Sequence, residues 1–268
     1  MIGQYYSLIH SMGSGASAID TDAQAFITAA AITDSTQQSA INTLVTDLKG
    51  YGLWTKLKAI YPFVGGTASS HKWNLKDPRD LDAAYRLVFS GGWTHSSTGA
   101  LPNGTNAYAD TKLTPSYALS QNNIHVSYYS RTNISFTDAL IGCSDSSYSN
   151  GLYLIPKNSP NTEFTRINQS SFATLTGHSS TYGMFLGNRI VSTSAKSFRN
   201  GSLINTININ SSGLSSNNVY IGSANVVPQQ YTSCECAFAS IGDGLTDTEA
   251  SNFYTAVQAF QTTLGRQV

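Results

Sequence analysis

CECAFASIGDGLTDTEASNFYTAVQAFQTTLGRQV closes the chain, at residues 234–268. Its first part, Cys234–Ile241, has the small and apolar side chains of a buried strand, and Gly242–Gly244 predicts a tight turn. The remainder, Leu245–Val268, predicts a helix that ends the chain. A single terminal helix after segments that otherwise resemble strands favours a β-sandwich over an enzyme of the α/β class.

The start of this helix is marked by a capping box. Thr246 and Glu249 fit the S/T-x-x-E pattern, in which each side chain accepts a hydrogen bond from the other residue's backbone N–H. Gly265 and Arg266 predict its end, since glycine stops helices and a cation favours the negative end of the dipole. We expect its apolar face to pack on the sandwich. That face comprises Ala250, Phe253, Tyr254, Val257, Phe260 and Leu264.

The composition carries little charge. Charged residues make up 11% of the 268 residues, against roughly 25% in ordinary globular proteins. Ser, Thr and Asn take their place, a surface that suits repetitive assemblies and contact with carbohydrate. The formal net charge is zero and no basic run occurs, which argues against nucleic-acid binding. No apolar stretch approaches 18 residues, so we expect no insertion into a membrane.

Cysteine usage leaves two interpretations open. Cys143, Cys234 and Cys236 are odd in number, and a bridge from Cys143 to one of the other two is one interpretation. The interpretation that we prefer is three buried thiols that behave as small apolar side chains. Such a chain fits folding in a reducing compartment.

Residues 1–60 have a helical pattern. Residues 1–18 lack the basic and apolar segments of a secretion signal. Thr21–Gln24 predicts the start of one helix and Asp34–Gln37 the start of another. Two or three small helices cannot bury their apolar stripe alone, so we expect them to anchor on the following domain, on sister chains or on a larger assembly. The stripe comprises Phe26, Ile27, Ile41, Leu44, Val45 and Leu48.

From residue 61 to residue 268 the pattern changes to short strands separated by Gly, Asn, Ser and Pro turns. Asn200-Gly201 gives the strongest hairpin signal. Such a series predicts a two-sheet jelly roll. The predicted strands are Ala84–Phe89, Tyr108–Thr111, His125–Thr132, Leu140–Cys143, Leu152–Ile155, Glu163–Ile167, Gly183–Arg189, Ala195–Arg199, Ser202–Ile209, Val219–Ser223 and Cys234–Ile241.

The order of several short motifs resembles the concanavalin A-like, laminin G-like sandwich. The segments that carry the resemblance are His125–Thr132, Ile141-Gly142, Ser197–Leu203, Tyr220–Gly222 and Leu245–Glu249. It covers residues 84–264. The resemblance implies a mainly β, concanavalin A-like jelly roll with a C-terminal helix and a small N-terminal helical region. The expected division is therefore a helical anchoring region, 1–60, and a laminin G-like domain, 61–268.

The chain as a whole also resembles structural proteins of tailed bacteriophages, notably crAss-like phages and others of Bacteroidetes hosts. The segments concerned are Thr21–Trp54, Tyr61–Gly66, Gly91–Thr94 and Leu101–Asn106. This resemblance implies a component of the virion, on head, tail or fibre, that contacts other virion proteins through its N-terminal helices. The stripe and the comparison with fibre proteins predict a homo-oligomer, with a trimer favoured over a dimer or a monomer docked on a shell.

Patterns of catalytic chemistry are weak. Gly13–Ala18 imitates a dinucleotide-binding loop, but the helix begins after it and no βαβ unit follows. Glu163, Glu235 and Glu249 lack the paired setting of a glycosidase. No G-x-S-x-G elbow occurs, and the histidines have no zinc-binding spacing. We therefore expect no enzyme.

The best ligand candidate is the segment 91–110, which we expect to form a loop. Aromatic faces stack on sugars, and Asn and Asp side chains hydrogen-bond to hydroxyls. The alternative is that the aromatic residues plug the end of the sandwich and the asparagines turn the chain. Laminin G-like domains often hold calcium, which by resemblance implicates Asp110 or Asp145–Ser147; turn formation is the alternative. The candidate ligand-binding residues are Trp93, His95, Asn103, Asn106, Tyr108 and Asp110.

Together these features predict a non-enzymatic phage virion protein whose sandwich projects from the particle and contacts host surface glycan. One alternative is a lectin module that binds host polysaccharide. Another is a secreted enzyme that degrades polysaccharide.

Overall fold

The computed structural model describes residues 18–268 except 136, 146–147, 160–161 and 177–179. Most of the glycine-rich run Gly13–Ala18 and of the leader 1–18 therefore lies outside the described residues. None of the described helices is both long and apolar enough to cross a membrane.

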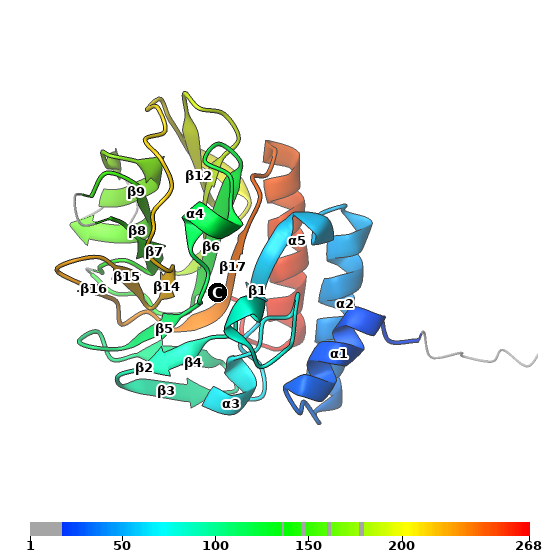
Figure 1. The fold of residues 1–268 in the computed structure, drawn as a ribbon. Helices are drawn as coiled ribbons and strands as arrows, with labels where there is room; N and C mark the ends of the chain where they lie inside the picture. The colour runs from blue at the N-terminus through cyan, green and yellow to red at the C-terminus, as the bar shows by residue number, and fades with distance from the viewer. Residues whose placement is uncertain (1–17, 136, 146–147, 160–161, 177–179) are drawn as a thin grey trace, which may run out of the picture.

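Two sheets pack face to face in a sandwich, as predicted (Figure 1). The eight-stranded helix-side sheet has the order β13-β12-β11-β6-β17-β4-β3, and β1 also pairs with β17. Its strands are β1 (Leu57–Tyr61), β3 (Trp93–Ser96), β4 (Gly99–Pro102), β6 (Ile124–Ser130), β11 (Gly183–Arg189), β12 (Ala195–Arg199), β13 (Ser202–Ile207) and β17 (Cys236–Gly242).

The nine-stranded distal sheet has the order β10-β9-β8-β7-β14-β5-β2, and β15 pairs with β7 and β16. Its strands are β2 (Val88–Ser90), β5 (Tyr108–Asp110), β7 (Ile141–Cys143), β8 (Gly151–Ser159), β9 (Thr162–Gln169), β10 (Ala173–Thr176), β14 (Tyr220–Ile221), β15 (Ser223–Asn225) and β16 (Gln230–Tyr231). The pairing of β15 with β7 is parallel, whereas the neighbouring pairs in the strand order are antiparallel.

The predicted Asn200-Gly201 hairpin is confirmed. It joins β12 to β13, with Arg199 paired to Ser202. Both turn residues have positive φ, 47° for Asn200 and 74° for Gly201, which is the backbone that a two-residue type I′ turn requires. β11 and β12 also have the predicted boundaries.

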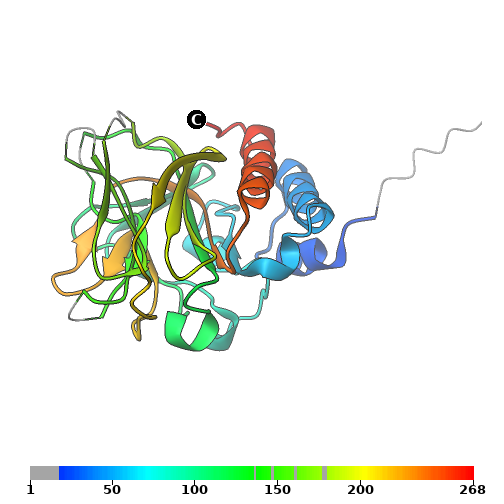
Figure 2. The same ribbon diagram turned by 90° about the horizontal axis from the view of Figure 1, so that it is seen from above.

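Helices α1 (Thr21–Ala29), α2 (Ser35–Gly50) and α5 (Asp247–Thr263) form a layer on the outer face of the helix-side sheet (Figures 1 and 2). The capping box of α5 is confirmed, because Thr246 and Glu249 exchange hydrogen bonds. Its predicted apolar face is buried or half-buried against this layer's core. Short helical turns complete the chain: α3 (Ala68–His71), α4 (Pro115–Ala118), η1 (Trp54–Lys56) and η2 (Asp82–Ala84).

The N-terminal stripe is buried within the chain, so of the three expected partners it is the following domain that covers it. All six of its residues are at most 4% exposed and share one cluster with α5 and the sheet. The physical reason is that α2 packs directly on α5, whose apolar face supplies the missing surface. The trimer stays a prediction, but this stripe no longer supports it.

The predicted boundary between the helical region and the sandwich, at residue 60, falls inside strand β1. The apolar residues after Trp54 were expected to continue the helical region, whereas Leu57–Tyr61 forms β1 and pairs with β17. All three cysteines are free and buried, as preferred from the sequence.

Candidate functional site

The segment 91–110 forms strands β3, β4 and β5 with tight turns, so the expectation of a loop is wrong. Trp93 is half-buried, and its Nε1–H donates to the carbonyls of Ser90 at 3.0 Å and Tyr108 at 3.2 Å. Its ring packs edge-on against Phe89, with centroids 5.3 Å apart. These contacts make Trp93 a packing residue at the end of the sandwich.

His95 also faces inward. Its Nδ1 lies 2.9 Å from Nδ1 of the buried His71, and its ring packs on Phe89. Burial lowers the pKa of both imidazoles, for His71 to about 3. One ring donates and the other accepts, so the accepting Nδ1 carries no proton in this contact.

Asn103 and Asn106 shape the turn between β4 and β5. The Asn103 Oδ1 accepts from the backbone N–H groups of Thr105, Asn106 and Ala107, at 3.0–3.2 Å. The Asn106 Oδ1 accepts from Asn103 Nδ2 and from the Gly92 N–H. The amides are thus used within the chain, as the alternative interpretation predicts.

Tyr108 has a different environment, on the outer face of the distal sheet. Its neighbours in sequence and pairing, Ala109 and Ile221, lie in the core between the sheets, so Tyr108 and Tyr220 point outward. The two rings are stacked, with centroids 4.5 Å apart and planes 14° from parallel. Both are half-exposed. Burial, together with Asp110, Tyr108 and Tyr231, raises the pKa of Tyr220 to about 12.

Polar groups flank this tyrosine pair. Asp110 pairs with Tyr220 across the strands and accepts from Asn218 Nδ2 at 3.1 Å. Its other contacts are the backbone N–H of Lys112 at 2.8 Å and the ammonium of the same residue at 3.0 Å. We name the half-exposed group Tyr108, Tyr220, Tyr231 and Asn218 the tyrosine platform.

Both aspartates that were expected to hold calcium already accept hydrogen bonds from the chain. Asp110 is bonded as above, and the Asp145 carboxylate accepts from Asn150, Ser215 and Ser216. Ser146 and Ser147 lie outside the described residues. Over the described part of the chain, no three His, Cys, Asp or Glu side chains gather as a metal site would require.

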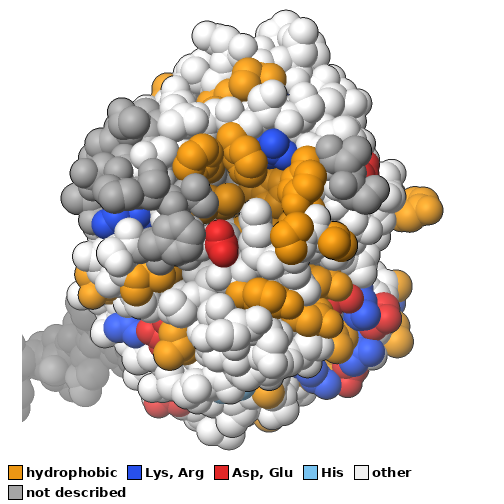
Figure 3. All heavy atoms as spheres, turned by 90° about the vertical axis from the view of Figure 1, so that its left-hand side faces the viewer, with side chains coloured by type: hydrophobic (Ala, Val, Ile, Leu, Met, Phe, Trp, Pro, Cys, Tyr) orange, Lys and Arg blue, Asp and Glu red, His pale blue; other side chains and the backbone are white. Residues whose placement is uncertain are grey.

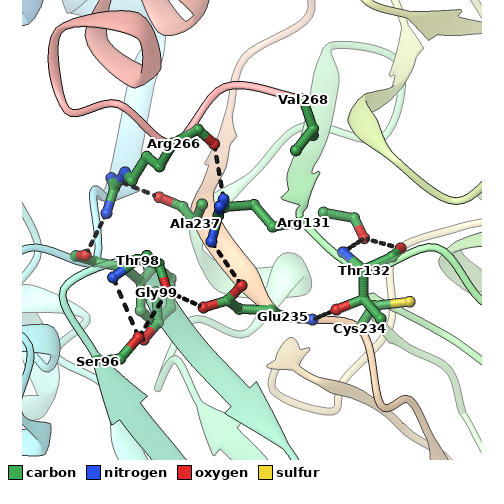
Figure 4. A network of polar contacts seen from close by, with 12 residues as sticks. Ser96, Thr98, Gly99, Arg131, Thr132, Cys234, Glu235, Ala237, Arg266 and Val268 are labelled. Carbon is green, nitrogen blue, oxygen red and sulfur yellow. Dashed lines mark hydrogen bonds and ion pairs between the residues drawn. The ribbon is translucent and has the colours of Figure 1, made fainter.

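A second polar cluster lies near the C-terminus, shown in Figure 4. Arg131 Nη1 donates to Glu235 Oε2 at 2.9 Å, and Thr98 Oγ1 donates to Oε1 at 2.6 Å. Arg131 Nε also donates to the carbonyl of Arg266 at 2.8 Å. Both oxygens of Glu235 are therefore held by donors, which favours a structural role.

The tyrosine platform includes one of the six predicted ligand-binding residues. Tyr108 belongs to it and Asp110 borders it, whereas Trp93, His95, Asn103 and Asn106 serve the fold. Alternation in Val219–Ile221 indicates that Tyr220 faces away from its neighbours, but not which strand lies beside it. Figure 3 shows the distal side of the molecule, where apolar side chains gather in the middle of the face.

No protein-family model and no curated protein matches this chain. Among solved structures it is similar to domain 4 of AbnA, a GH43 extracellular arabinanase from Geobacillus stearothermophilus, solved with arabinotriose. The TM-score is 0.45 at 14% identity, over 74% of this chain and 98% of that domain.

It is also similar to botulinum neurotoxin type C, whose cell entry depends on two ganglioside molecules, with a TM-score of 0.48 at 10% identity over 77% of this chain. The binding domain of serotype G gives 0.45 at 13% identity over 74%. The chain spans 52% and 50% of these two neurotoxin chains. At such scores the likeness supports no conclusion about a ligand.

Proposed function

We propose that the protein is a glycan-binding β-sandwich module and that the tyrosine platform is its sugar-binding surface. The observation that carries the proposal is the stacked, half-exposed pair of Tyr108 and Tyr220 on an outward sheet face. An aromatic ring offers a sugar an apolar surface and, in tyrosine, a hydroxyl at its edge. Apolar side chains that gather on an exposed surface mark interaction sites.

The surroundings suit a sugar better than a charged partner. The Asn218 amide beside the rings is bonded to Asp110 and Thr114, and the Asp110 carboxylate is already matched by the Lys112 ammonium. The chain as a whole has a net charge of zero and 11% charged residues. Recognition would then rest on ring stacking and hydrogen bonds between neutral groups.

A glycan array followed by calorimetry on the best ligand tests this function. Tyr220→Ala should weaken binding about tenfold, about 1.4 kcal/mol, because it removes one ring of the pair. Tyr117→Ala is the matched control, since Tyr117 is 90% exposed on α4, outside the platform. Equal losses in both variants, or an array without ligands, would refute the proposal.

We also propose that the module binds without cleaving. The three glutamates are engaged separately: Glu163 with Ser197 and Thr165, Glu235 with Arg131, and Glu249 with Lys56 and the helix cap. No pair of them has the shared site that glycoside hydrolysis needs. Release of reducing ends from any bound polysaccharide by the purified protein would contradict this.

A place on a phage particle remains a second proposal. Its support is the resemblance of residues 21–54 and of three shorter segments to phage virion proteins, and it is compatible with glycan binding. Mass spectrometry of purified particles tests it, and absence of the protein from them would refute it.

A further inference from the structure

Half-exposed aromatic side chains gather at a second place on the outer face of the distal sheet. On β8, Leu152 and Leu154 belong to the core between the sheets, so Tyr153 and Ile155, which alternate with them, point outward. Three half-exposed rings pack against the small apolar cluster to which Tyr153 and Ile155 belong. We name these rings the outer aromatic cluster: Tyr148, Phe164 and Phe172.

The rings of this cluster are held in place by their neighbours. Phe172 and Phe164 are nearly perpendicular, with centroids 5.4 Å apart. The Arg166 guanidinium lies 3.8 Å from the centroid of Phe172. The Tyr148 hydroxyl donates to the Val227 carbonyl at 2.8 Å. Because these orientations are already fixed, a ligand that covers the rings pays little conformational entropy for ordering them.

The strand register places the cluster on the same face as the tyrosine platform. Tyr220 pairs with Gly142, and Gly142 with Tyr153; directly paired residues share one face of a sheet. Strands about 4.8 Å apart put Tyr153 about 10 Å from Tyr220. The Phe172 ring contacts both Tyr153 and Arg166 of the next strand, β9. The two aromatic groups are therefore further apart than one sugar ring spans, but within reach of one oligosaccharide.

The hairpin of β15 and β16 connects the two groups. The Tyr231 hydroxyl of the platform donates to Gln229 Oε1 at 2.8 Å, and the Tyr148 hydroxyl of the cluster donates to Val227 at the tip of this hairpin. Val227 is 80% exposed, and residues 223–231 carry no charge. The platform and the cluster thus belong to one uncharged, aromatic face, and exposed apolar faces of this kind mark interaction sites.

We propose that the tyrosine platform and the outer aromatic cluster together bind several consecutive residues of a linear, uncharged polysaccharide. This inference rests on the proposed function. One sugar stacks on the platform, and a sugar further along the same chain stacks on the cluster. A single terminal sugar would contact the platform alone, so the second group of half-exposed rings indicates a longer ligand.

Calorimetry of the full chain with oligosaccharides of increasing length tests this inference. The probes are size-fractionated linear oligosaccharides, from disaccharide to hexasaccharide, cut from the polysaccharide that binds best in the glycan array. We expect the hexasaccharide to bind at least about tenfold more tightly than the disaccharide, because it adds contacts with further aromatic rings.

Two variants of the outer aromatic cluster show where the longer chain binds. Phe172→Leu and Tyr148→Leu keep an apolar side chain but remove a ring, and each should lower the ratio of hexasaccharide to disaccharide affinity severalfold. A partly unfolded variant has fewer active chains, but this ratio is unaffected because both affinities come from the folded chains. Tyr117→Ala is the control and should keep the ratio, since Tyr117 is 90% exposed on α4, outside both groups.

Equal affinity for the disaccharide and the hexasaccharide would overturn this inference and leave the glycan-binding proposal intact. A ratio that stays at the wild-type value in both Phe172→Leu and Tyr148→Leu would overturn it too, because the longer chain would then extend over another surface. A best-bound array ligand that is charged or not a linear chain would have the same consequence. An array without ligands would instead refute the proposed function itself.

Discussion

Arg266, three residues from the C-terminus, holds the terminal segment to the sandwich, and its replacement by Met should be strongly destabilising. Its guanidinium is 1% exposed and donates to the carbonyls of Pro62, Phe63 and Ala237 at 2.6–3.0 Å. It also donates to Gln261 Oε1 at 2.6 Å. The residue thus ties α5 to the turn after β1 and to β17.

The magnitude follows from the buried hydrogen-bond acceptors that lose their donor in Arg266→Met. The Ala237 carbonyl still accepts from Gln261 Nε2 at 3.3 Å. The acceptors left without a donor are therefore the carbonyls of Pro62 and Phe63 and the Gln261 amide oxygen. Each buried acceptor without a donor costs about 1–3 kcal/mol. Part of this is offset, because the variant no longer buries the cation whose pKa burial lowers to about 9. We therefore expect a net loss of about 2–4 kcal/mol.

Urea unfolding at pH 7, followed by fluorescence, measures this loss. The matched control is Arg79→Met, since Arg79 is 64% exposed and pairs with Asp77 on the surface; it should change stability by less than about 0.5 kcal/mol. Equal m-values are required for the comparison. A loss below about 1 kcal/mol for Arg266→Met would refute the reasoning.

Three further predictions concern stability and assembly. Burial lowers the pKa of His71 from 6.5 to about 3 and that of His125 to about 4. Below about pH 6.5 the unfolded chain therefore binds more protons than the folded chain, and the urea midpoint should fall as the pH is lowered from 6.5 to about 4. A urea midpoint that does not change over this range would contradict the prediction. Phe253→Ala should lower the free energy of unfolding by about 3–5 kcal/mol because Phe253 is fully buried. Thr246→Ala should lower it by about 1 kcal/mol through the lost helix cap. Urea unfolding measures both, and a larger loss for Thr246→Ala than for Phe253→Ala would contradict these roles. Light scattering tests self-association: a mass of three chains supports the trimer, and a mass of one chain, 28.7 kDa, refutes it.

The sequence predicted local structure well because short-range chemistry determines it. The cap of α5 depends on residues three positions apart, and the Asn200-Gly201 turn on two adjacent residues. β1 was missed because it follows the short helical turn η1 directly, with no turn residue between them. Its strand conformation is imposed by pairing with β17, about 180 residues later in the chain.

The site was harder to predict for the same reason. Aromatic and amide side chains in residues 91–110 suggested a ligand loop, but Trp93 and Asn103 satisfy backbone groups of their own segment. Tyr108 and Tyr220 meet only because β5 pairs with β14, which no spacing in the sequence shows.

A crystal structure with the tightest ligand from the glycan array tests the central claim most directly. The account predicts a sugar ring on the outer face of the distal sheet, in contact with Tyr220 and Tyr108. A sugar bound on any other face, for instance beside Asn103 and Asn106, would contradict it.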